Sequence, residues 1–416
     1  YARSLPPANL TMRNRSTLTA SLCQQGEVYE AGGTDQALRE ARRFYDESLR
    51  WAEKLLQAEY GSVTITGEII RVLEQTGYLY EKAGGVLNYK KALPYYEKAL
   101  QMEEENMEKC GESPERQRNI EISCNKVGNA WMRIGTWEKD ALEKARPYLE
   151  RAMDIAVRLA EQIELDKYRW DLSLCFHRYA EWLQLTEGDQ DKIRNYYLRA
   201  FEIRKRLNEK QKTLASRKSL AVSYEKLIIV YSRSSSYHDW AVAANYAQKF
   251  SDLSREIAEN EKTVESRMDL ANAYTLTGDQ YARLGRSEIQ YVPRAEAYYQ
   301  DALKIWPEII GEIRTYRAYT DYIGTYFRAA QLAVRMKQYD RAERCFEATL
   351  ALTEEFLKTE PEESYRLMLP DIYMEIADFY ENIDREKYLE KCLDLYHRAL
   401  NIYESVDTVS GNDKYT

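Results

Sequence analysis

Apolar and small residues return along the chain in the same order about every 50 residues. An aromatic or apolar residue is followed four positions later by a mostly small residue, and three positions after that by another aromatic or apolar residue. Spacings of four and three place these side chains on one face of an α-helix. The eight central positions are Gly26, Gly77, Gly128, Ala180, Ile228, Gly278, Ala330 and Ala377. A fixed period of this length predicts a stack of structural repeats.

A second helical pattern follows the first in every repeat. In the second repeat it reads Ala92, Tyr96, Ala99 and Leu100, and the same columns return in the others. Small residues let two helices approach closely, and the aromatic ring fills the space beside them. Each repeat is therefore predicted to be two antiparallel helices of roughly twenty residues, which is longer than the average globular helix.

Turn residues mark the ends of these helices. Gly84-Gly85 separates the two helices of a repeat, whereas Ser113-Pro114 and Thr213 mark the start of new repeats. No linker or low-complexity stretch divides the chain, so we expect a single array over residues 1–416, with a polar tail that frays. The predicted repeats are 8–62, 63–113, 114–166, 167–212, 213–262, 263–312, 313–361 and 362–406, followed by the tail 407–416.

Composition narrows the classes of partner. The chain has 35 Tyr against 8 Phe, and a tyrosine can fill a helix seam with its ring while its hydroxyl stays at the wet edge. The net charge of −8 disfavours nucleic acid and anionic membranes as partners. No apolar run approaches the length that spans a bilayer. The six cysteines show no paired spacing, so we expect reduced thiols in a cytoplasmic protein.

These columns resemble the tetratricopeptide repeat, and the sixth repeat matches best through Tyr274, Gly278, Tyr281, Ala295 and Tyr299. The resemblance covers residues 10–405 and implies an all-α fold, a right-handed α-solenoid of about eight helical hairpins.

The period departs from the usual repeat of roughly 34 residues and resembles a long variant typical of bacterial multidomain proteins. In such proteins the array is often joined to an effector domain. Because the chain opens on Tyr1, we expect it to be a piece of a longer protein with an effector domain before it. The seventh repeat keeps the usual spacing between its two helices, from Ala330 to Ala342.

Catalytic chemistry is not visible in the sequence. Cys175 and His177 point in different directions from one helix, and Cys345 and His397 are expected to be a buried thiol and an exposed imidazole. There is no zinc-ligand spacing and no glycine-rich phosphate loop. We therefore predict no catalytic, cofactor-binding or metal-binding residues, and a protein that is not an enzyme.

The resemblance implies a concave wall built from the first helix of each repeat. Its residues lie six and three positions before, and one and four positions after, the central position. The predicted partner-binding residues are Glu27, Glu30, Arg71, Glu74, Tyr78, Glu81, Asn125, Asn129, Met132, His177, Glu181, Gln184, Glu225, Ile229, Asn272, Thr275, Asp279, Phe327, Gln331, Asp371, Met374, Asp378 and Glu381.

This wall would be acidic at both ends and mixed in the middle. Asn125 and Asn129 are one turn apart, and their amides can hydrogen-bond the backbone of an extended peptide. A basic clamp for a peptide carboxylate is missing apart from Arg71. The sequence therefore predicts a non-catalytic scaffold that binds a protein or peptide, with a basic partner favoured. Two alternatives stay open: a module that assembles into a homo-oligomer, and an enzyme whose site is not recognised.

Overall fold

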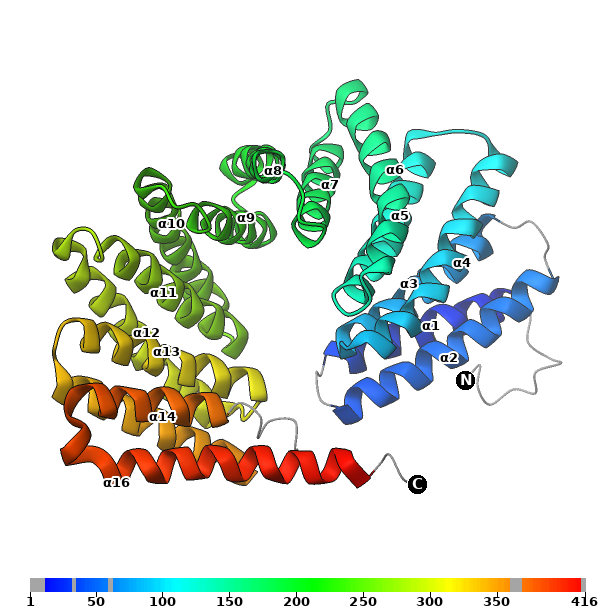
Figure 1. The fold of residues 1–416 in the computed structure, drawn as a ribbon. Helices are drawn as coiled ribbons and strands as arrows, with labels where there is room; N and C mark the ends of the chain where they lie inside the picture. The colour runs from blue at the N-terminus through cyan, green and yellow to red at the C-terminus, as the bar shows by residue number, and fades with distance from the viewer. Residues whose placement is uncertain (1–11, 32–34, 59–62, 360–368, 413–416) are drawn as a thin grey trace. The chain divides into compact units, whose positions relative to one another are not determined.

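The chain folds into consecutive helical hairpins. The computed structural model describes residues 12–31, 35–58, 63–359 and 369–412, and within these ranges it contains helices and no strand. The chain separates into two compact units, Tyr1–Lys212 and Thr213–Thr416 (Figure 1). The predicted all-α solenoid of helical hairpins is therefore confirmed.

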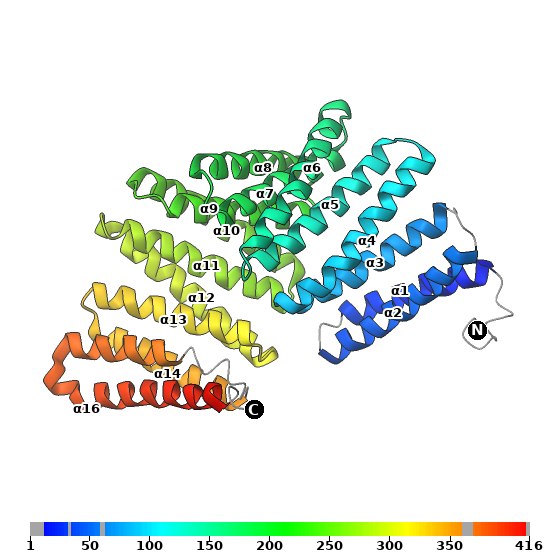
Figure 2. The same ribbon diagram turned by 45° about the vertical axis from the view of Figure 1, so that its right-hand side comes forward.

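The first unit contains four hairpins. Its helices are α1 (Met12–Ala31), α2 (Asp35–Ala58), α3 (Val63–Ala83), α4 (Val86–Cys110), α5 (Pro114–Gly135), α6 (Asp140–Gln162), α7 (Asp166–Leu185) and α8 (Gln190–Gln211). Each helix packs against the next one along the chain, and the first helices of neighbouring hairpins, such as α5 and α7, also touch (Figure 2). This second set of contacts forms a continuous wall of first helices.

The second unit repeats the arrangement. Its helices are α9 (Leu214–Ser232), α10 (Tyr237–Glu261), α11 (Val264–Leu284), the 3-10 turn η3 (Ile289–Tyr291), α12 (Val292–Glu312), α13 (Tyr316–Arg335), α14 (Tyr339–Thr359) and α16 (Leu369–Asn412). The first helices α11 and α13 touch as α5 and α7 do. The turn η3 lies in the connection between the two helices of the sixth repeat.

The last helix reverses its direction. In α16 the Tyr403 hydroxyl donates to Asp371 Oδ1 over 3.4 Å, and the Tyr396 hydroxyl donates to Asp378 Oδ1 over 2.7 Å. A straight helix would hold Tyr403 and Asp371 about 48 Å apart. The chain therefore turns back within α16 and makes the eighth hairpin (Figure 1). The helix continues to Asn412, past the point at which the sequence suggested a frayed tail; residues 413–416 lie outside the described part.

The central positions are where the two helices of a hairpin come closest. A Cβ atom on Gly77 would stand 2.6 Å from the ring of Tyr96, and one on Gly128 would stand 2.7 Å from Leu149. Tyr96 is 1% exposed, so its ring has no space into which to move. Glycine is thus required by the ring of the second helix, as the two sequence patterns predict.

The fifth hairpin solves the same packing problem in reverse. Its first helix carries Ile228 where most repeats have glycine or alanine, and its second helix carries Ala247 where most have a large side chain. Both residues are fully buried, and α9 packs against α10. Compared with the other hairpins, the large and the small residue have exchanged helices.

Helices α8 and α10 end in the same unusual way. Lys212 and Lys262 follow their last residues with φ angles of 50° and 54°, in the left-handed region. Their backbone N–H groups donate to Asn208 O and Ala258 O, which closes the last turn. Glycine adopts this conformation without the steric strain that a side chain brings.

Candidate functional site

A pocket of about 430 Å³ lies on the wall formed by α3, α5 and α7 in the first unit. Residues from three successive hairpins line it: Glu74, Gln75, Tyr78, Glu81, Tyr96, Ile122, Asn125, Lys126, Asn129, Leu174 and Arg178. Glu74, Tyr78, Glu81, Asn125 and Asn129 are among the residues predicted for the wall. The structure therefore brings five of the predicted residues together around one cavity.

Asn129 presents an acceptor that has no hydrogen-bond donor. The residue is 4% exposed, and its Nδ2 donates to Glu81 Oε1 over 2.6 Å. Because a carboxylate only accepts hydrogen bonds, this contact fixes which end of the amide faces Glu81. The other end, Oδ1, is buried without a partner. A buried acceptor in this state costs about 1–3 kcal/mol, and a donor from a ligand would remove that cost.

Asn125 repeats this arrangement one turn earlier on α5. It is 6% exposed, and its Nδ2 donates to Glu121 Oε1 over 2.5 Å and to Cys175 Sγ over 3.1 Å. Its Oδ1 also lacks a partner. Two buried amide oxygens on the same face of α5 therefore lack a hydrogen-bond donor.

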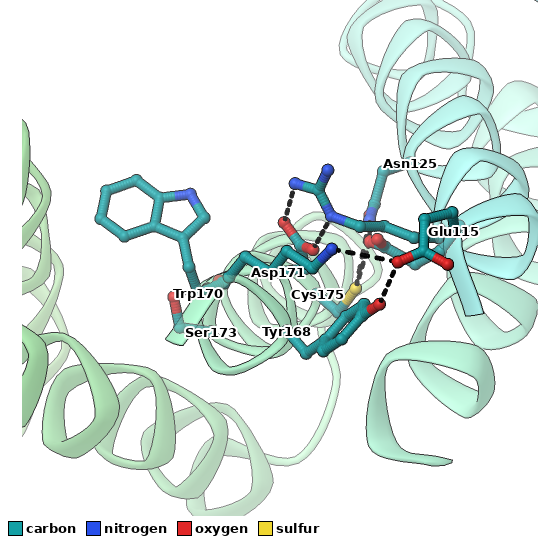
Figure 3. A network of polar contacts seen from close by, with 10 residues as sticks. Glu115, Asn125, Tyr168, Trp170, Asp171, Ser173 and Cys175 are labelled. Atoms are coloured by element: carbon teal, nitrogen blue, oxygen red, sulfur yellow. Dashed lines mark hydrogen bonds and ion pairs between the residues drawn. The ribbon is translucent and has the colours of Figure 1, made fainter. Parts of the chain in front are cut away.

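A polar network joins α5 to α7 beside the pocket (Figure 3). The Arg118 guanidinium binds the Asp171 carboxylate through two hydrogen bonds of 2.5 Å and 3.1 Å. The Cys175 thiol donates to Glu121 Oε1 over 3.1 Å. Burial raises the pKa of Glu121 to about 7 and raises the pKa of Cys175 well above its usual value. The network fixes the two helices that carry Asn125 and Leu174 on the pocket wall.

The tyrosines of the second helices reach the wall through the seam. The hydroxyl of Tyr96 donates to Glu81 Oε2 over 2.9 Å, and that of Tyr197 donates to Gln184 Oε1 over 2.8 Å. In the second unit the hydroxyl of Tyr299 donates to Asp279 Oδ1 over 2.7 Å. Glu81, Gln184 and Asp279 stand one or four positions after their central residues. They are predicted wall residues that also accept hydrogen bonds from tyrosines of the second helices.

Five of the ten predicted acidic residues, counting Glu181, are paired with a cation. Arg71 Nη2 lies 2.6 Å from Glu27 Oε1, and Lys126 Nζ lies 2.9 Å from Glu74 Oε2. In the second unit the pairs are Arg328 with Asp279 at 3.0 Å and Arg385 with Glu381 at 3.2 Å. These pairs make the wall closer to neutral than the sequence predicts, because the lysine and most of the arginines lie outside the four predicted columns.

Three predicted residues belong to the packing of the protein. Met132 is 1% exposed and packs in a buried cluster with Trp182, so it does not reach a binding surface. His177 is buried against the ring of Tyr197, and burial lowers its pKa to about 4. Phe327 is half-buried and packs with its ring against the buried Phe346.

The remaining predicted residues are spread along the first helices. In the first unit Glu181 pairs with Arg178, and the side chain of Glu30 lies outside the described part. In the second unit Asn272 donates to Asp321 and Gln331 donates to Glu375. The half-buried residues Glu225 and Ile229, the buried residue Thr275, and the exposed residues Asp371, Met374 and Asp378 complete the set.

The sequence interpretation missed six lining residues. Tyr96 lies on the second helix of its hairpin, outside the columns of the predicted wall. Ile122 and Leu174 stand six positions before their central residues, a column that the predicted wall includes, but they were left out of the set. Gln75, Lys126 and Arg178 stand two positions before, in a column that the predicted wall leaves out. Because this column lies beside the chosen ones on the helix, a wall one column wider would have included all three.

Cys175 and His177, two positions apart on α7, contact different groups. Cys175 contacts Glu121 and Asn125, whereas His177 lies beside Glu181 and Arg204. All six cysteines are free thiols. In the described ranges no three His, Cys, Asp or Glu side chains are grouped so that they could hold a metal ion. No helix in the described part of the chain has the length and apolarity needed to cross a membrane.

Comparison with known proteins identifies one repeat directly. The tetratricopeptide repeat model matches residues 323–356, which span most of α13 and α14 in the seventh hairpin. This hairpin is the one whose helix spacing is that of the standard repeat. No curated protein matches the sequence.

Three solved structures are similar to this chain at low sequence identity. The apo form of RapI is 11% identical, with a TM-score of 0.49 over 95% of this chain and 98% of that one. The nuclear import adaptor Nro1 of S. pombe is 11% identical, with a TM-score of 0.45 over 75% of this chain and 93% of that one. Acl4, an assembly chaperone of RpL4, is 16% identical, with a TM-score of 0.41 over 67% and 91%.

Proposed function

We propose that this chain is a non-catalytic protein-interaction module that binds a peptide or protein segment across α3, α5 and α7. One observation carries the proposal. Asn125 and Asn129 line the pocket on this wall, and the side-chain oxygens of both are buried and have no donor. A binding partner that brings N–H groups would satisfy both.

The spacing of the two asparagines supports an extended peptide as that partner. Four residues along a helix give a rise of about 6 Å. In an extended chain, N–H groups on the same side recur every second residue, at about 6.6–6.8 Å. Two backbone N–H groups of one peptide strand can therefore donate to Asn125 Oδ1 and Asn129 Oδ1 together. Such contacts recognise a backbone without regard to its side chains.

The other groups of the pocket favour binding over chemical turnover. Its lining has no serine, cysteine or histidine, and Glu81 and Asn129 are held by hydrogen bonds to each other and to the scaffold. Tyr78, Ile122 and Leu174 supply apolar surface for peptide side chains. The resemblance of the long repeats to bacterial proteins favours a bacterial, cytoplasmic setting, and the other predicted wall residues would extend the contact beyond the pocket.

A peptide array tests the proposal. The array carries capped decapeptides of varied sequence and is probed with the full chain and with Asn129→Ala. Removal of one buried acceptor should weaken the recovered peptides about tenfold, in line with a hydrogen bond of about 1–3 kcal/mol. The matched control is Asn195→Ala, which removes an exposed amide on α8 and should change nothing.

Hydrogen exchange supplies the position of the contact. Bound peptide should slow exchange in α3, α5 and α7 more than in the other helices of the first unit. Equal affinities of Asn129→Ala and the native chain, with the helical circular dichroism preserved, would remove the pocket as the binding site. The same conclusion would follow if protection appeared only outside these three helices.

A further inference from the structure

We propose that the pocket selects a basic side chain, lysine or arginine, through the carboxylate of Glu81. This inference rests on the proposed peptide-binding function and adds the chemical class that the pocket prefers. The selectivity comes from the balance of charges on the lining.

The charges of the pocket leave one carboxylate without a counter-ion. Glu74 pairs with Lys126 at 2.9 Å, and Arg178 pairs with Glu181 at 3.1 Å. Glu81 accepts from the Tyr96 hydroxyl and from Asn129 Nδ2, but no cation pairs with it among the described residues. The lining holds two carboxylates and two cations, and Glu81 is the carboxylate that has no paired cation.

The hydrogen bonds to Glu81 aim this charge at the pocket. The Tyr96 hydroxyl holds Oε2 and the Asn129 amide holds Oε1, so the carboxylate is fixed in orientation by groups on two different helices, α4 and α5. A carboxylate offers about four acceptor positions, and these two contacts use only part of them. An ammonium or guanidinium group can thus bind without breaking either contact.

Two further groups on the pocket lining also suit a donor. The oxygens of Asn125 and Asn129 are buried acceptors without partners. Tyr78, Ile122 and Leu174 provide apolar walls against which the methylene stem of a lysine can lie. An anionic side chain would instead meet Glu81 and two unsatisfied acceptors, so the pocket disfavours acidic peptides.

A positional scan tests the selectivity. The probe is one capped decapeptide recovered from the array, with each position in turn replaced by lysine, norleucine or glutamate. Norleucine keeps the apolar stem and lacks the ammonium group. At one position lysine should bind at least tenfold more tightly than norleucine, and the ratio should fall at high salt because the attraction is electrostatic.

Two variants connect this ratio to Glu81. Glu81→Gln removes the charge but keeps hydrogen-bonding groups, so the lysine-to-norleucine ratio should fall to near one, whatever the change in overall affinity. Lys126→Gln leaves Glu74 without its counter-ion and should raise the ratio. This second variant tests the charge balance even if Glu81→Gln folds poorly.

The outcomes separate this inference from the proposed function. If Asn129→Ala weakens every peptide but neither charge variant alters the ratio, the basic-side-chain preference is wrong and peptide binding stands. If no decapeptide binds the native chain, both proposals are wrong. A preference for glutamate at every scanned position would also overturn the inference.

Discussion

The ring of Tyr96 fills the space above Gly77, and its hydroxyl donates a hydrogen bond of 2.9 Å to the carboxylate of Glu81. One side chain therefore joins the interior seam of a hairpin to the pocket on its wall. A substitution in the seam that moves the Tyr96 ring should also move the Tyr96 hydroxyl, and so alter the position of Glu81 in the pocket. The same relation joins Gly278, Tyr299 and Asp279 in the second unit.

Gly77→Ala should destabilise the first unit. The new methyl group would stand 2.6 Å from the buried ring of Tyr96, and overpacking of this kind costs about 1–3 kcal/mol. Because alanine is a better helix former by about 1 kcal/mol, the net loss should be at the lower end of that range. Urea unfolding followed by circular dichroism measures the change.

Gly67 offers a matched control on the same helix. Nothing lies within 4 Å of a Cβ atom placed there, and the position is exposed. Gly67→Ala should therefore stabilise α3 by up to about 1 kcal/mol through helix propensity alone. If Gly77→Ala and Gly67→Ala change the free energy of unfolding in the same direction, the space beside Gly77 can accept a methyl group and the prediction is wrong.

Glu121→Gln should change how stability depends on pH. Burial raises the pKa of Glu121 from 4.5 in the unfolded chain to about 7 in the folded one, beside Arg118, Asp171 and Cys175. A carboxyl whose folded pKa is raised keeps its proton longer in the folded state, so its contribution to stability falls as the pH rises from 4.5 to about 7.

In Glu121→Gln the stability contribution of this carboxyl should no longer fall as the pH rises from 4.5 to about 7. Relative to the native protein the variant should gain stability progressively across that range, up to about 3 kcal/mol at 1.4 kcal/mol per pKa unit. The difference in free energy of unfolding between variant and native protein, measured by urea titration from pH 4 to pH 8, isolates the contribution. A difference that does not vary with pH would contradict the prediction.

His177→Gln should change the pH dependence of stability in the opposite direction. Burial lowers the pKa of His177 from 6.5 to about 4, beside Glu181, Arg178 and Arg204. The unfolded chain then binds a proton more readily than the folded one, so the native protein loses stability as the pH falls from 6.5 to about 4. His177→Gln should not show this loss. The difference in free energy of unfolding between the variant and the native protein should therefore be up to about 3 kcal/mol larger at pH 4 than at pH 7.

The two titrations overlap between pH 4.5 and pH 6.5 and oppose one another. The native chain should therefore show a weaker pH dependence from these groups than either single variant does. If the double variant Glu121→Gln/His177→Gln differs from the native protein by a nearly constant free energy over this range, the two contributions are of similar size. Parallel slopes for the two single variants would show that one assignment is wrong.

Lys212→Gly should stabilise the end of α8. Lys212 has a φ of 50°, a conformation that strains a residue with a side chain by roughly 1 kcal/mol and that glycine adopts freely. The midpoint of urea unfolding should rise. As a control, Lys205→Gly inside α8 should lower it, because glycine costs about 1 kcal/mol in a helix interior. A fall for both variants would mean that flexibility in the unfolded chain outweighs the relief of strain.

The sequence predicts the seam well because sterics set its period. Gly77 and Gly128 must be small wherever a ring or a leucine crosses them, and this requirement returns with every hairpin. Asn125 and Asn129 follow from the same reasoning, since their spacing alone places them on one face of a helix. Local periodicity therefore suffices for the hairpins and for the two asparagines of the pocket.

The pairing across the wall could not be predicted in the same way. Lys126 and Glu74 are 52 positions apart, and their contact depends on how far one hairpin is displaced along its neighbour. Met132 was expected on the wall because it stands four positions after Gly128, but in this hairpin that position packs into a buried cluster with Trp182 of the next. These features follow from the stacking offset, which the period does not contain.

The exchange of Ile228 and Ala247 has a consequence for how such repeats evolve. A bulky residue on one helix of the fifth hairpin is tolerated because its partner column has become small. Drift at either column alone is disfavoured, whereas a compensated pair can persist through descent. The two positions should therefore covary in related chains. A hairpin without the central glycine can still be recognised by a small residue in the matching column of its second helix.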